Sequence, residues 1–269
     1  IWGLPYLFIK FVVAELDPAV TVFSRTLPAS IILLGWSAAR GNLRGNLKFW
    51  AAAAGFGLVE MVFPWWWISR AEQDLDSGLV GLLLATVPLF GVLIARLRGD
   101  HTAFAKRRLL GLAVGTLGVL MLVGLDPASL HLSLLPVLMV FGSAFGYAVG
   151  PVFLSKAQGA DGPTLIGMAM LAVSIIYIPI VATRWPATLP SAGVIGSIAI
   201  LTLVCTVAAF LIFFALIGEI GPMRVTLVTY VNPAIALILG VAFADERLTL
   251  GLILGFPTVL AGSWLASRR

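Results

Sequence analysis

Charge is scarce in this sequence. Lys, Arg, Asp and Glu make up 11% of the 269 residues, whereas an ordinary soluble domain has about 25%. Apolar residues make up 60%. So few charges cannot cover the surface of a soluble domain, and so much hydrophobicity excludes a disordered chain. The composition therefore predicts an integral membrane protein with many spans, not the two soluble domains that the length alone would suggest.

Reactive and metal-binding residues are equally rare. The chain has one cysteine, Cys205, which cannot form a disulfide within the chain. This excludes a small secreted protein held together by disulfides. The two histidines, His101 and His131, fall in loops predicted near opposite membrane faces. No H-E-x-x-H, P-loop or paired-Asp motif occurs, and no basic patch is interleaved with aromatics as nucleic-acid binding requires. We therefore expect no catalytic site, metal site, cofactor or nucleic-acid partner.

Long apolar runs fill the chain instead. Each has the roughly 20 residues that a helical membrane span needs, and the runs are continuous, not alternating as in a β-barrel strand. The predicted fold is an all-α integral membrane protein of ten spans joined by short loops. These loops are expected near residues 15–18, 40–48, 70–77, 98–107, 125–131, 156–163, 184–190, 218–223 and 244–248.

The Lys and Arg residues of these loops are unevenly distributed. With a cytoplasmic N-terminus, twelve of them fall inside and three, Arg70, Arg184 and Arg247, fall outside. The twelve are Arg40, Arg44, Lys48, Arg96, Arg98, Lys106, Arg107, Arg108, Lys156, Arg224, Arg268 and Arg269. Because positive loop charge favours the cytoplasm, we expect both termini there, in a bacterial inner membrane.

An internal repeat aligns the chain with itself at an offset of about 145 residues. The aligned pairs are Pro5 with Pro151, Lys10 with Lys156, Pro18 with Pro163, Pro88 with Pro233, Gly111 with Gly255 and Gly118 with Gly262. The predicted halves are residues 1–125 and 126–269, with five spans each. Because five is odd, the second half enters the membrane from the opposite side, as in many secondary transporters, whose sites lie between the repeats.

Short motifs in the same order occur in a known family. They are Trp2-Gly-Leu-Pro5 leading to Lys10, Pro18 before Arg25, T-V-P-L-F at 86–90, Y-V-N-P-A at 230–234, and D-E-R-L-T at 245–249 before Gly255 and Gly262. Over essentially its whole length the chain resembles the drug/metabolite transporter superfamily, EamA type. Two positions depart from repeat symmetry: His101 stands where the second half has Glu246, and Met170 stands opposite Arg25.

The resemblance implies a secondary transporter that exports small organic solutes by alternating access, with aromatic and other neutral amino acids as the favoured substrates. A broad drug or metabolite exporter is the alternative within this class. A membrane-embedded enzyme acting on lipid substrates is the alternative outside it, and it would need the acid/base or metal clusters that the sequence lacks.

Three charged residues fall inside predicted spans, where charge is costly and marks functional sites. Lys10, Arg25 and Glu60 all lie about 9–13 Å below the outer membrane face, at a rise of 1.5 Å per residue. We expect Glu60 to pair with Lys10 or Arg25, leaving one positive charge for a substrate carboxylate. A purely structural ion pair and a proton-carrying Glu60 remain the alternatives.

Aromatic and amide side chains complete the predicted site. A tyrosine within a span needs a hydroxyl partner and so favours a wet cavity. A run of three tryptophans, at Trp65, Trp66 and Trp67, is typical of an interface belt. Three successive side chains on a helix point in widely different directions, however, so at least one must face the bundle. The predicted substrate-binding residues are Tyr6, Lys10, Glu60, Trp67, Tyr147, Phe210, Phe214, Tyr230 and Asn232.

Prolines and glycines indicate bends and close helix packing. Pro88 and Pro233, equivalent in the repeat, are predicted hinges because each removes a backbone donor near mid-span. Glycines four residues apart, as at Gly111 and Gly115 or at Gly251 and Gly255, let helices approach closely. The sequence leaves open whether this seam joins spans 5 and 10 of a monomer or two copies of the chain.

Overall fold

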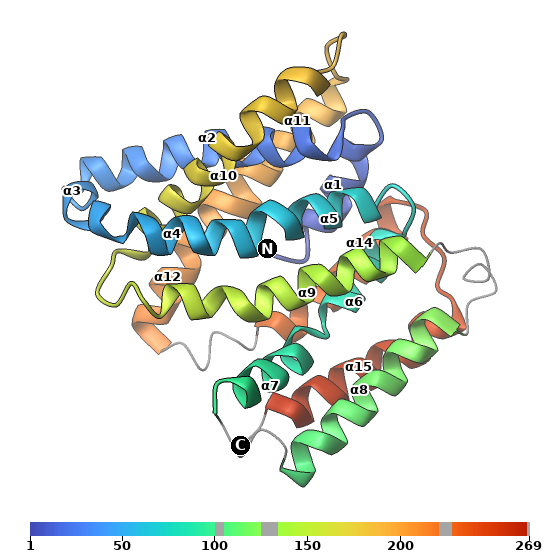
Figure 1. Ribbon diagram of the computed structural model, residues 1–269. Coiled ribbons are helices and arrows are strands. Elements are labelled where there is room, and N and C mark those ends of the chain that lie inside the picture. The colour runs from blue at the N-terminus through green and yellow to red at the C-terminus, as the bar shows by residue number, and fades with distance from the viewer. Residues whose placement is uncertain (100–104, 125–133, 221–227, 268–269) are drawn as a thin grey trace.

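The computed structural model describes residues 1–99, 105–124, 134–220 and 228–267, and helices are the only regular secondary structure within these ranges (Figure 1). Six helical segments are long and apolar enough to cross a membrane. They are Pro18–Ala39, Leu43–Ala71, Ser77–Leu97, Leu134–Leu154, Gly162–Arg184 and Ala192–Ile220, with the shorter apolar helices Val231–Phe243 and Leu250–Ala266 after them. The prediction of an all-helical membrane protein is confirmed.

The elements follow one another with short connections. Those before residue 125 are α1 (Pro5–Val13), α2 (Pro18–Ala39), α3 (Leu43–Asn46), η1 (Leu47–Phe49), α4 (Trp50–Gly57), η2 (Leu58–Val62), α5 (Phe63–Ala71), α6 (Ser77–Leu84), α7 (Val87–Leu97) and α8 (Lys106–Gly124). Those after it are α9 (Leu134–Leu154), α10 (Gly162–Arg184), α11 (Ala192–Thr202), η5 (Leu203–Ala208), α12 (Ala209–Ile220), α14 (Val228–Phe243) and α15 (Leu250–Ser267).

Helix starts follow local sequence signals. The Asp17 carboxylate accepts a hydrogen bond from Ala19 N at 2.8 Å, and Pro18 occupies the first turn of α2. In the same way the Asp161 carboxylate accepts one from Thr164 N at 3.0 Å, with Pro163 in the first turn of α10. A short acidic cap satisfies the free N–H groups of the first turn, and proline needs none there.

Four departures from regular α-helix interrupt the long segments, and the first is η1, a single 3-10 turn. The stretches η2 and η5 are π-helical, and they begin 145 residues apart, at Leu58 and Leu203. A turn at residues 85–86 separates α6 from α7 just before Pro88. Proline cannot donate to the preceding turn, and the nearby Ala85 carbonyl accepts a hydrogen bond from Ser263 Oγ of α15 at 2.6 Å instead.

The seam of α8 and α15 depends on glycine. These two helices lie side by side with α7 at one edge of the bundle, at the bottom of Figure 1. A Cβ on Gly118 would lie 2.5 Å from Val259 N, and a Cβ on Gly262 would collide with the backbone of Gly115. Small residues allow this backbone approach. The structure therefore places the seam within one chain, which the sequence could not decide.

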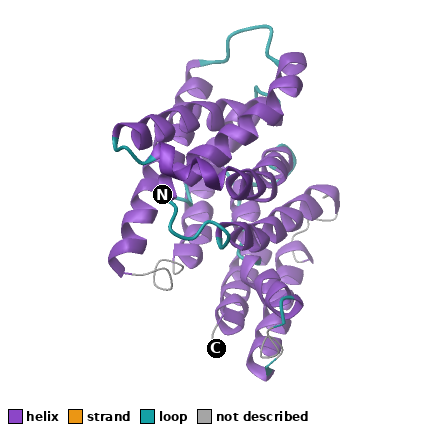
Figure 2. Ribbon diagram, turned by 60° about the vertical axis from the view of Figure 1, so that its left-hand side comes forward, coloured by secondary structure: helices purple, strands orange, loops and turns teal. Residues whose placement is uncertain are grey.

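Polar contacts group the loops at two ends of the bundle. At one end Ser191 N donates to Glu15 at 2.8 Å and Arg184 pairs with Asp17 at 2.8 Å. At the other end Asn42 Nδ2 donates to the Asp161 carboxylate at 3.1 Å. Loops predicted to share a membrane face therefore meet. Figure 2 shows the same helical bundle from a second direction, with loops at its periphery.

Candidate functional site

A buried arginine marks the interior of the bundle. Arg25, in the middle of α2, is 7% exposed. Its Nε donates to Thr206 Oγ1 of η5 at 2.7 Å, and its guanidinium carbon lies 4.0 Å from the ring centroid of Trp65 in α5. No carboxylate of the described residues forms an ion pair with it. The guanidinium is thus desolvated and held by one hydroxyl and an aromatic face, which leaves its remaining N–H groups for another partner.

The π-helical turn of η5 explains why Thr206 can serve the arginine. Its hydroxyl donates to Leu201 O, five residues back, at 2.7 Å while it accepts from Arg25. The wider turn of a π-helix creates this i→i−5 geometry, and such turns recur at functional sites. The local irregularity at η5 therefore orients the side chain that holds the arginine.

Two tyrosines surround this cation. Tyr6 of α1 and Tyr147 of α9 both interact electrostatically with Arg25, and Tyr147 also interacts with Glu60 and Trp65. Tyr6 packs against α6, where a Cβ on Gly81 would lie 3.4 Å from its ring. Four helices thus bring Arg25, Trp65, Tyr6 and Tyr147 together. The predicted residues Tyr6 and Tyr147 belong to this cluster.

Glu60 lies on the π-helical stretch η2. Its Oε2 atom is buried and accepts no hydrogen bond from the part of the chain that the structure describes. The carboxylate packs directly on Gly150 of α9, where no Cβ would fit. Among the described residues no ion pair joins Glu60 to Lys10 or to Arg25, so the expected pairing is not formed in this structure. The two cations have other partners.

Lys10 reaches the end of the bundle that holds the segment between α5 and α6. Its Nζ donates to Leu75 O, in the segment between α5 and α6, at 2.6 Å. Glu72, which is fully buried, interacts with Lys10 and with the carboxylate of Glu246, which is 8% exposed. Burial raises the pKa of Glu72 well above its usual range, the Lys10 ammonium lowers it, and the Glu246 carboxylate raises it further.

Glu246 caps a helix of the other half of the chain. Its carboxylate accepts hydrogen bonds from Ser77 N at 2.5 Å and Gly78 N at 2.9 Å, at the start of α6. Its Oε2 atom packs against Gly240 of α14, where an added Cβ would overlap it. A carboxylate at a helix N-terminus is favoured by both the free N–H groups and the helix dipole. His101, its counterpart in the sequence repeat, lies outside the described residues.

Replacing Glu246 by glutamine is expected to destabilise the protein by about 1–2 kcal/mol, because the charge that caps α6 is lost. Thermal unfolding in detergent micelles measures this. Glu219, an exposed glutamate on α12, supplies the matched control, and Glu219→Gln is expected to melt with the wild type. An unchanged melting temperature for Glu246→Gln as well contradicts the cap.

The remaining predicted residues are spread around the cluster. Trp67 contacts Phe63, with the ring centroids 5.7 Å apart, and packs on Gly142 of α9. Trp65, not Trp67, is the tryptophan at the arginine. Phe210 and Phe214 form an aromatic group with Trp2 at the start of α1. Pro233 and Asn232 lie within the helix α14. The Tyr230 side chain lies outside the described part of the structure.

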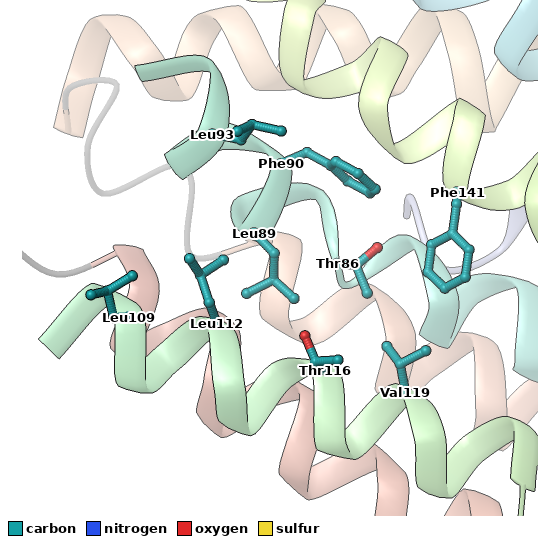
Figure 3. Close-up of a pocket in the computed structure, with 9 residues that line it drawn as sticks. All are labelled: Thr86, Leu89, Phe90, Leu93, Leu109, Leu112, Thr116, Val119 and Phe141. Atoms are coloured by element: carbon teal, nitrogen blue, oxygen red, sulfur yellow. The ribbon is translucent and has the colours of Figure 1, made fainter. Parts of the chain in front are cut away.

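Two hollows open in the described structure, and neither is lined by a residue of the arginine cluster. An apolar cavity of about 470 Å³ opens between α7, α8 and α9, with Leu89, Phe90 and Leu93 of α7 facing Leu109 and Leu112 of α8 (Figure 3). Its inner end reaches the break before Pro88. A second groove of about 390 Å³ is lined by Lys10, Glu15 and Ser191, at the end where Arg184 pairs with Asp17. Lys10 is therefore reachable from that end.

The family model for EamA-like transporters matches residues 1–124 and 134–268. The chain belongs to this family. It is 30% identical to the "Uncharacterized inner membrane transporter YedA" of Escherichia coli over 93% of this chain and 81% of the relative. It is also 20% identical to the "Probable amino-acid metabolite efflux pump" of Salmonella typhimurium, over 98% of this chain and 90% of that one.

A crystal structure of a protein shares the fold of this EamA-family chain, with a TM-score of 0.68 and 18% identity over 99% of this chain and 93% of the other. The family and the names of its relatives describe transporters and not enzymes. The predicted family, membrane embedding and transporter class are therefore confirmed.

Sequence reasoning missed three residues of the arrangement. Trp65 is only one of three successive tryptophans in the sequence, Thr206 belongs to no motif, and Glu72 falls in the loop predicted near residues 70–77. The repeat gives Thr206 an indirect signal, because η5, which holds it, begins 145 residues after the stretch that holds Glu60.

Proposed function

We propose that this EamA-family protein is a secondary transporter that exports aromatic or other neutral amino acids and related small metabolites across a bacterial inner membrane. The observation that carries the proposal is Arg25, a buried guanidinium with an aromatic face and no carboxylate partner among the described residues. Arginine binds carboxylates through two parallel hydrogen bonds, and an amino acid supplies that group.

The surroundings of Arg25 suit the rest of an amino acid. With the carboxylate at Arg25, the side chain meets the aromatic rings of Trp65, Tyr6 and Tyr147, which favour planar and apolar groups. Glu60, close to Tyr147, offers a buried carboxyl oxygen that can accept a hydrogen bond from the ammonium group. In this arrangement Arg25 binds the carboxylate of the substrate and Glu60 binds its ammonium group. Each residue therefore pairs with the substrate and not with the other.

We propose ten membrane spans arranged as two inverted five-helix halves, residues 1–125 and 126–269, that alternate access to this site. The 145-residue offset between η2 and η5 supports the repeat, as do the Asp17 and Asp161 caps at the starts of equivalent helices. The twelve-to-three distribution of loop Lys and Arg supports cytoplasmic termini.

Pro88 is the stronger of the two proposed hinges. The chain already breaks at residues 85–86 before it, and the Ala85 carbonyl is held by Ser263 of the other half. Pro233 lies within the helix α14. A bend at Pro88 alone still moves α7 relative to α6 and changes the cavity that α7 lines.

Broad export of apolar drugs or metabolites is a second candidate, favoured by that apolar cavity of about 470 Å³. A cavity of this size holds a drug-sized molecule, and its lining contains no charged side chain among the described residues.

Uptake by proteoliposomes of a panel of labelled amino acids, with and without a pH gradient, tests the proposal. We expect aromatic and neutral amino acids to accumulate faster than in empty liposomes, and charged ones not to. Transport of apolar drugs without transport of any amino acid supports the second candidate and contradicts the first.

A further inference from the structure

Glu72 is the most deeply buried acid at the outer end of the bundle. It is the first residue after α5 and is 0% exposed. Neither of its carboxylate oxygens accepts a hydrogen bond from the residues that the structure describes. A buried ionised carboxylate without donors costs several kcal/mol, and such a group takes up a proton instead.

The charged groups at Glu72 include one cation, Lys10, for two carboxyl groups, Glu72 itself and Glu246. The titratable groups that act on it within the described structure are Lys10 and Tyr6 of α1 and Glu246 before α15. Glu246 has two backbone N–H donors, and Lys10 donates to Leu75 O. Lys10 is the one cation among these groups, and of the two carboxyl groups the one with no donor is the one that holds a proton.

We propose that Glu72 is a proton-binding site that couples transport by this protein to the proton gradient; the coupling rests on the transporter function proposed above. In the step that we infer, the Glu72 carboxylic acid releases its proton to water in the outer groove, which Lys10 lines. The resulting carboxylate attracts the Lys10 ammonium away from Leu75 O. Rebinding of a proton restores the first state.

This exchange has a mechanical consequence. The Lys10–Leu75 hydrogen bond ties α1 to the segment between α5 and α6, and Gln73 Nε2 donates to Val13 O of α1 at 3.4 Å beside it. Moving Lys10 to Glu72 loosens α1 at the outer opening. Because α1 also carries Tyr6 of the arginine cluster, the protonation of Glu72 acts on the proposed substrate site.

Infrared difference spectroscopy during a pH titration tests the proton-binding site without any substrate. The wild type in lipid is expected to show carbonyl bands of protonated carboxylic acids, and Glu72→Gln is expected to lose one component that Glu60→Gln keeps. Asp74→Asn, two residues away at an exposed position paired with Arg70, is expected to keep that component. A Glu72→Gln spectrum that retains every component of the wild-type bands overturns the assignment.

Transport tests the coupling separately. The wild type is expected to respond to a pH gradient, Glu72→Gln is expected to transport at one rate with and without the gradient, and Asp74→Asn is expected to stay gradient-dependent. A gradient-dependent Glu72→Gln overturns the proposal.

If the wild type transports nothing, the proposed function and its coupling fail, whereas the infrared band still decides the proton site. Should Glu72→Gln not fold, Lys10→Gln is expected to keep the band to higher pH.

Discussion

Replacing Arg25 by glutamine is expected to lower amino-acid transport about 100-fold. Hydrogen bonds to a charged group contribute about 1.5–3 kcal/mol, and losing both arms of a carboxylate clamp at a desolvated arginine reaches the upper part of that range, at 1.4 kcal/mol for each tenfold change. Glutamine can still donate a hydrogen bond from its side-chain amide to Thr206 Oγ1, which accepts one from Arg25 Nε in the wild type. Initial transport rates in proteoliposomes measure the effect.

Two comparisons separate the clamp from a structural role. Arg184→Gln removes an exposed arginine that pairs with Asp17, and its transport is expected to match the wild type. An aromatic amine that lacks the carboxylate is expected to bind wild type and Arg25→Gln equally. Equal loss of the amine and the amino acid, together with a lowered melting temperature, contradicts the carboxylate role and leaves Arg25 as a packing residue.

Replacing Gly262 by leucine is expected to destabilise the protein by at least about 3 kcal/mol and to abolish transport. Even a Cβ at Gly262 collides with the Gly115 backbone, so the larger side chain forces α15 away from α8. Overpacking a close-packed site costs about 1–3 kcal/mol, and more where backbone is the obstacle. Thermal unfolding in detergent and transport in proteoliposomes measure the two effects.

Gly35 offers a matched control for the seam. It lies on α2 with no atom within 4 Å of its Cβ position, so Gly35→Leu is expected to unfold within a few degrees of the wild type. A Gly262→Leu variant that is as stable as Gly35→Leu contradicts the packing of α8 on α15 within one chain.

Much of the fold is predictable because membrane helices are encoded locally. Apolar runs of span length and the caps at Asp17 and Asp161 fix where helices begin without any tertiary contact. The loop groups also follow from the order of spans along the chain. The break at residues 85–86 was signalled by Pro88, whose missing N–H acts within its own helix.

The candidate site is less predictable because side-chain partners come from other helices. Sequence periodicity could say that one of three successive tryptophans faces the bundle, but only the rotation of α5 selects Trp65 over Trp67. The partners of the interior charges could not be predicted from the sequence for the same reason. Lys10 and Glu60 share an expected depth, yet Lys10 meets Leu75 O, whereas Glu60 packs on Gly150.

The sequence by itself determined the membrane environment, the helical class, the family and the rarity of interior charge. Each of these depends on composition or on residues close together in the chain. The tertiary structure decided which charges are buried and with what neighbours. Glu72, read as a loop charge, is buried beside Lys10, and Arg25 lies between Trp65 and Thr206. Burial and charge pairing depend on how the helices rotate and approach one another, and that is set by packing across the whole bundle.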